Sequence, residues 1–106
     1  METIINALRQ FNDERNWEQF HDPKNLALAL SIEAAELNEC FLWKKAEDAD
    51  IASVKEELAD VFNYAFMLAD KYHLDIREIC LEKIRKNAQK YPVEKSFGSA
   101  KKYNEL

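Results

Sequence analysis

The sequence predicts an all-α protein, a four-helix bundle-like unit that assembles into oligomers. Apolar residues recur at intervals of three and four, and almost no segment alternates as a strand would. One glycine and two prolines leave the chain few places to break a helix. Its 106 residues fit one domain. We expect a helical domain over residues 1–92 and an extended tail over 93–106.

The first two helices are predicted over about residues 3–15 and 23–43. Apolar side chains follow one side of the first helix, and a polar and aromatic loop over 17–22 separates it from the second. Asp22 followed by Pro23 is typical of an N-cap and the first helical position. The second helix should therefore begin at Pro23.

A charged connector, 44–49, leads to a third helix over about 50–72, with Asp50 placed to cap it. The chain breaks at His73 and Leu74, and Asp75 is placed to cap a fourth helix. That helix should end near residue 90, because Pro92 disfavours helical geometry in the residue before it.

Composition excludes several classes of function. The net charge of −5 disfavours nucleic acid as a partner. Charged residues interrupt the first twenty positions, which argues against a signal peptide or a membrane partner and favours a cytoplasmic protein. The two cysteines form no C-x-x-C pair, so zinc and redox motifs are not indicated. Gly98 is the only glycine, so no glycine-rich loop can hold phosphate.

Acidic residues lie where a helix is expected to be apolar. At about 100° per residue, Glu33 falls within the stripe formed by Leu26, Leu30 and Leu37, and Glu36 lies one turn further along.

The third helix repeats this arrangement. Glu57 falls within the stripe formed by Val54, Val61 and Leu68, and Asp60 follows one turn later. Two helices therefore direct four carboxylates into the seam that they are expected to share.

Four buried carboxylates repel one another unless a cation joins them. Ligation by carboxylates alone selects hard divalent ions, which favours Mg²⁺, with Mn²⁺ as an alternative. Iron is disfavoured, because no histidine lies three residues after these glutamates. The alternative is a solvated face or Glu-to-Lys helix pairs, an interpretation that suits Glu39 and Glu56.

The spacing E33-x-x-E36, twenty residues, then E57-x-x-D60 resembles the signature of the MazG-like all-α NTP pyrophosphohydrolase superfamily. Six stretches look like its dCTP pyrophosphatase branch: 14–26, 33–37, 41–43, 56–61, 83–92 and 98–103. The resemblance implies hydrolysis of dCTP, modified dCTP or other nucleoside triphosphates to a monophosphate and pyrophosphate. It also implies that the catalytic and metal-binding residues are Glu33, Glu36, Glu57 and Asp60.

The resemblance further implies a set of substrate-binding residues. Two tryptophans would wall the base pocket, a histidine would contact base or phosphate, and side chains on the third and fourth helices would hold phosphate or sugar. Core packing or surface exposure would explain several of these residues equally well. The set is Trp17, His21, Trp43, Tyr64, Lys83 and Asn87.

Other questions stay open at this point. Ile32 and Ala35 stand where the branch has glycines, so the preference among bases is undecided. The alternative functions are a nucleotide-sensing protein without turnover and a non-catalytic oligomerisation module. A domain this small leaves apolar surface over, so we expect a homo-oligomer. By resemblance, it would be a dimer or a tetramer made of two dimers.

Overall fold

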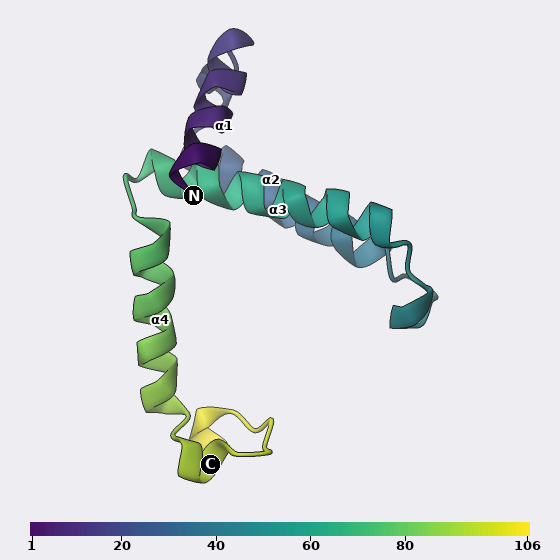
Figure 1. Cartoon of the computed structure of the whole chain (residues 1–106), viewed down its shortest axis with the longest axis vertical. Helices are drawn as coiled ribbons and strands as arrows, with labels where there is room; N and C mark the ends of the chain where they lie inside the picture. The colour runs from purple at the N-terminus through teal and green to yellow at the C-terminus, as the bar shows by residue number, and fades with distance from the viewer. The chain divides into compact units, whose positions relative to one another are not determined.

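The computed structural model describes all 106 residues, and it is helical without strands, as predicted. By their contacts the residues form two units, Met1–His73 and Leu74–Leu106, which are described separately. Figure 1 labels the longer helices. The elements of the first unit are α1 (Glu2–Glu14), η1 (Glu18–Phe20), α2 (Pro23–Glu39), η2 (Ala46–Asp48) and α3 (Ile51–Lys71). Those of the second unit are α4 (Ile76–Lys90), α5 (Val93–Ser96) and η3 (Tyr103–Glu105).

An antiparallel pair of helices, α2 and α3, forms the centre of the first unit (Figure 1). Leu26 of α2 is 1% exposed and is the most deeply buried large side chain. Helix α1 packs near the C-terminal end of α3, where Arg9 Nε donates to Asp70 Oδ2 at 2.9 Å. The ends of three helices thus meet around Leu26.

Helix α2 begins as predicted and ends earlier than predicted. Asp22 Oδ1 accepts a hydrogen bond of 2.7 Å from the Asn25 amide, which confirms the N-cap. The helix ends at Glu39 rather than near Trp43, so the predicted end was wrong. Beyond Glu39, successive amides bond to carbonyls three residues back, and Trp43 adopts a φ of +60°, which a right-handed helix cannot contain.

Helix α3 lies within a residue of its predicted bounds, but its cap differs. Asp50 makes no hydrogen bond to a backbone amide at the start of the helix. Its Oδ2 instead accepts from the Ser53 hydroxyl at 2.8 Å. Asp50 thus occupies the N-cap position, as predicted, without a cap hydrogen bond.

The second unit consists of α4 and the segment that follows it. Asp75 Oδ1 accepts from the Glu78 amide at 2.9 Å, so α4 has the predicted cap, and it ends at Lys90 before Pro92. Where an extended tail was expected, the chain forms α5 and η3. The ring centroids of Tyr91 and Tyr103 lie 6.2 Å apart, so η3 packs against the C-terminal end of α4.

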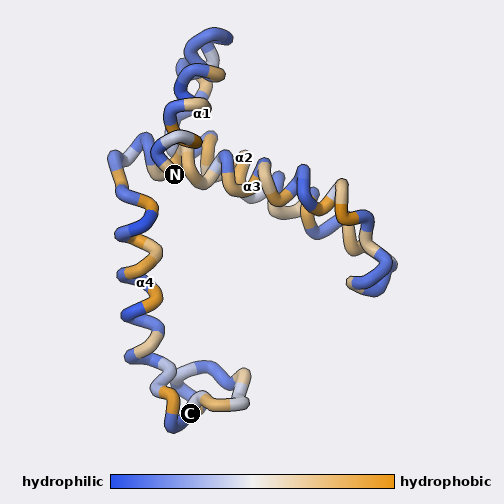
Figure 2. The backbone as a smooth tube through the Cα atoms, in the orientation of Figure 1, coloured by the Kyte–Doolittle hydropathy of each residue, from blue (hydrophilic) through white to orange (hydrophobic).

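Few side chains are fully buried. Only three apolar residues fall in that class: Leu26, Ala49 and Ala69. On α2 and α3, large apolar side chains one turn apart stay exposed, and both helices carry hydrophobic colour along their length (Figure 2). These exposed residues are Leu28, Ile32, Leu58 and Phe62. None of the helices combines the length and the apolar character needed to cross a membrane.

Candidate active site

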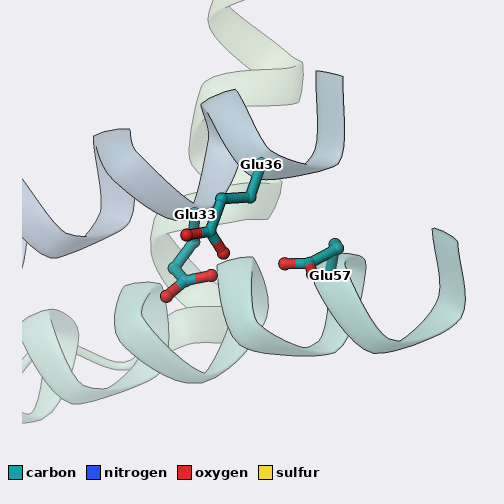
Figure 3. Close-up of side chains that lie close together, drawn as sticks. All are labelled: Glu33, Glu36 and Glu57. Carbon is teal, nitrogen blue, oxygen red and sulfur yellow. The ribbon is translucent and has the colours of Figure 1, made fainter. Parts of the chain in front are cut away.

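Three carboxylates converge between α2 and α3 (Figure 3). Glu33 and Glu36 come from successive turns of α2, and Glu57 comes from the facing turn of α3. One oxygen from each lies within 4.8 Å of the others. Glu33 and Glu57 lie within the apolar stripes of their helices, and these stripes face each other. Both side chains therefore lie in the seam between α2 and α3.

The electrostatics of this group are unfavourable without a cation. Glu33 Oε2 and Glu57 Oε2 are buried and have no hydrogen-bond partner. Burial, followed by the neighbouring Glu36, raises the pKa of Glu33 to about 7. The same two causes raise the pKa of Glu57. None of the ion pairs in the chain involves these side chains, so their charge is not neutralised from within.

The donor set fits a divalent cation. Orphaned buried oxygens are normally satisfied by protein, water or an ion, and a carboxylate cluster selects hard metals. The raised pKa values have the same origin, because neighbouring carboxylates compete for a proton when no metal joins them. Glu33, Glu36 and Glu57 thus form a candidate metal site.

Asp60, the fourth predicted ligand, lies one turn after Glu57 and outside the group of three. Its charge contributes to the raised pKa of Glu33, so it lies close enough to act on the group. It is exposed and lines a pocket that adjoins the carboxylates. Asp60 therefore connects the candidate metal site to that pocket.

The pocket has a volume of about 280 Å³ and is lined by residues of α1, of the segment around η1 and of α3. Trp17 and Phe11 contact each other edge to face, with ring centroids 5.6 Å apart. Four predicted site residues line it: Trp17, His21, Asp60 and Tyr64. Five further residues were not selected from the sequence: Leu8, Phe11, Asn12, Asn63 and Met67.

Some polar groups of the pocket have hydrogen-bond partners within the chain, and others have none. His21 Nδ1 is buried without a hydrogen-bond partner. Burial, then the charge of Glu33, raises the pKa of Tyr64, so its hydroxyl keeps its proton and stays a donor beside the carboxylates. Of the residues that the sequence reasoning missed, Asn12 left a readable signal, because it lies four residues after Leu8 on the apolar side of the first helix.

The other predicted residues lie elsewhere. Trp43 is 95% exposed and does not line this pocket. Lys83 and Asn87 lie one turn apart on α4, in the second unit, and their part in the site stays a prediction. A second hollow of about 350 Å³ is lined by Glu36, Glu57 and Lys44, among others. Lys44 is a cation that the sequence reasoning did not select.

A comparison with known protein families identifies the family of this chain. The MazG-like family matches residues 28–106, a stretch that contains all four acidic positions. This chain belongs to the MazG-like family.

Individual proteins of known name are also similar to this chain. The dCTP pyrophosphatase 1 of Mus musculus is 41% identical over 114 residues, which cover all of this chain and 67% of the relative. The dCTP pyrophosphatase 1 of Homo sapiens is 38% identical with the same coverage. A crystal structure of a pyrophosphatase from Archaeoglobus fulgidus is 40% identical and superimposes with a TM-score of 0.81, over 87% of this chain and 92% of that one.

Proposed function

We propose that this protein hydrolyses deoxynucleoside triphosphates, dCTP or modified dCTP foremost, to the monophosphate and pyrophosphate with Mg²⁺. The observation that carries the proposal is the group of three carboxylates, two with orphaned buried oxygens, beside a pocket walled by aromatic rings. The relatives named dCTP pyrophosphatase 1 and membership of the MazG-like family support the reaction class, a nucleoside triphosphate pyrophosphohydrolase.

The carboxylates hold the metal in this proposal. Glu33, Glu36 and Glu57 bind it from two helices, and Asp60 extends the site toward the pocket. A divalent cation held by these residues would supply charge neutralisation for the triphosphate and a water molecule of lowered pKa. A carboxylate of the site that keeps an oxygen free of the metal would accept the proton of that water.

The adjoining pocket holds the nucleoside. The ring of Trp17 offers a stacking surface for the base. Tyr64, which lies between the pocket and the carboxylates, is placed to donate to the sugar or a phosphate oxygen. His21 has an unpartnered ring nitrogen for a contact with the base or a phosphate.

Cationic and amide groups complete the site around the phosphates. Lys44 lines the hollow beside Glu36 and Glu57, where its ammonium group would donate to a phosphate oxygen. Lys83 and Asn87, carried over from the resemblance, are proposed to contact phosphate and sugar.

We also propose that the protein works as a homo-oligomer in the cytoplasm. Leu28 and Ile32 on α2 and Leu58 and Phe62 on α3 are large apolar side chains that one copy leaves exposed. A second copy of the chain would cover them, in a dimer or a tetramer made of two dimers.

The test is a panel of the four common deoxynucleoside triphosphates, dUTP, ribo-CTP and 5-methyl-dCTP with Mg²⁺. Pyrophosphate and monophosphate are measured separately from free phosphate. We expect Mg²⁺-dependent release of pyrophosphate that falls at least about 100-fold in Glu36→Gln, as for other lost catalytic groups. Glu56→Gln, an exposed residue of α3 that lines neither the pocket nor the hollow, is the matched control and keeps its activity.

The two alternative functions give other results in the same panel. Nucleotide binding without turnover would favour a sensing protein. Absence of both binding and turnover would favour a helical oligomerisation module, and either result would overturn the proposed enzyme.

A further inference from the structure

Asn12 is the most deeply buried polar residue of the chain, with 4% of its surface exposed. It lies on α1 and lines the pocket that adjoins the carboxylates. Its backbone carbonyl accepts from the Trp17 amide at 3.0 Å, which fixes the turn that carries the tryptophan. A polar side chain buried in this position needs a partner for each of its groups.

The amide of Asn12 is only half satisfied. Its Nδ2 donates to Met67 Sδ at 3.2 Å, and that is the one hydrogen bond its side chain makes. A thioether sulfur only accepts, so it orients the amide with nitrogen toward the sulfur. The amide oxygen accepts no hydrogen bond from another residue, and it is not one of the fully buried atoms without a partner, so it keeps accessible surface for a ligand.

The surroundings of Asn12 suit a flat heteroaromatic ligand. Trp17, Phe11, Leu8 and Met67 give the pocket apolar and aromatic walls. Stacking on an aromatic face holds any base with little discrimination. A buried amide beside that face supplies the missing selectivity, because only some bases can hydrogen-bond to it.

We propose that Asn12 selects for nucleobases that carry an exocyclic amino group. The free amide oxygen accepts from the amino group at C4 of cytosine. Uracil and thymine place a carbonyl oxygen at the same atom, which would face the amide oxygen with no proton between them. This inference rests on the proposed function and names the residue that sets its base preference.

The experiment compares two pairs of substrates that differ only in the amino or keto group and the ring proton beside it: dCTP with dUTP, and 5-methyl-dCTP with dTTP. The quantity measured is the ratio of kcat/KM within each pair, with Mg²⁺ and one enzyme preparation. This ratio does not depend on how much of a variant is folded. We expect wild type to favour the amino-bearing member by roughly tenfold or more.

Asn12→Leu keeps the size of the side chain and removes its acceptor, so both ratios should fall to within about twofold of one. Asn12→Asp keeps an acceptor oxygen and should retain the preference. Asn6→Leu makes the same change at an exposed position on α1, and its ratios should equal those of wild type.

An unchanged ratio in Asn12→Leu would overturn the role of Asn12. This holds with or without an equal loss of activity on all four nucleotides, since the residue would then be structural. A wild-type enzyme that releases pyrophosphate equally from both members of each pair would also overturn it while leaving the proposed reaction intact. Failure of the proposed function shows separately, as absence of pyrophosphate from every substrate.

Discussion

At the scale of single residues, the buried oxygen of Glu33 couples folding to pH. The pKa of its carboxyl is raised from 4.5 to about 7, so the folded chain holds a proton that the unfolded chain releases. The stability of the metal-free protein should therefore fall as the pH rises through this window. The pKa of Glu57 is also raised, so Glu57 acts in the same direction. The pKa values of Asp50 and Asp70 are lowered, so their contribution to stability is lost only as the pH falls through those lowered values, below this window.

Thermal unfolding with a chelator between pH 5 and pH 7.5 measures this coupling. The melting temperature of wild type should decrease across the range, and the decrease should be smaller in Glu33→Gln, which cannot titrate. Greater stability of the metal-free wild type at pH 7.5 than at pH 5 would contradict the prediction.

The same residues predict stabilisation by metal. Because Mg²⁺ would bind the folded carboxylates and not the unfolded chain, it should raise the melting temperature by several degrees at millimolar concentration. Glu57→Gln should abolish this rise. Glu56→Gln, the neighbouring exposed residue, should retain it, and an equal rise in both variants would place the metal elsewhere.

Residue positions on a helix were predictable to different degrees. The angular positions of Glu33 and Glu57 followed from the sequence, because both helices are regular over those turns. Asp60 was expected to join them; its charge acts on both Glu33 and Glu57, and its role as a fourth ligand stays a prediction. Asn12 was missed because its burial depends on Met67, which lies 55 residues away in the sequence.

At the scale of elements, the helix caps give a direct comparison. Asp22→Ala removes a cap bond of 2.7 Å to the Asn25 amide and should destabilise the protein by about 1 kcal/mol. Asp50→Ala removes an exposed bond to the Ser53 hydroxyl and should destabilise the protein less than Asp22→Ala does. Urea unfolding at one fixed protein concentration measures both. Equal losses would contradict the assignment of caps.

The attachment of α1 should affect substrate binding more than stability. Arg9 and Asp70 form an exposed ion pair, which contributes little to stability because water screens it, yet α1 carries part of the pocket wall. In Arg9→Met we expect KM for the nucleotide to rise several-fold while kcat stays within about twofold, because the carboxylates on α2 and α3 are unaffected. A loss confined to kcat, measured by steady-state kinetics, would contradict this.

Helix ends were predictable where a side chain or a proline sets them. Pro23 and Pro92 mark such ends, and the structure agrees. The end of α2 at Glu39 was not predictable, because Phe41 and Leu42 continue the apolar pattern and no glycine follows. The left-handed residue that turns the chain is Trp43, a side chain that rarely signals such a conformation.

At the scale of the whole molecule, the small number of buried side chains predicts that folding depends on association. Phe62→Glu puts a charge on an exposed apolar position of α3 and should reduce the mass measured by light scattering and lower the melting temperature. Lys55→Glu introduces the same residue at an exposed polar position of α3 and should do neither. A wild-type protein that is monomeric at micromolar concentration would contradict the prediction.

Trp43 gives a second prediction at this scale. Its ring is 95% exposed on one chain, so we expect it to complete the site of a neighbouring copy. Neither Glu57→Gln nor Trp43→Ala should be fully active alone, but mixed and reassembled subunits should regain activity. Trp17→Ala should give no such recovery with Glu57→Gln, because Trp17 and Asp60 line one pocket of the same chain.

The candidate metal site and the pocket are formed by different elements. The carboxylates belong to α2 and α3, whereas much of the pocket wall comes from α1 and the segment around η1. Substitutions at positions such as Leu8 or Asn12 can therefore alter which nucleotide is accepted without moving a group that performs the hydrolysis. A change of substrate therefore requires no change in the two helices' acidic residues, because five of the nine residues that line the pocket precede α2.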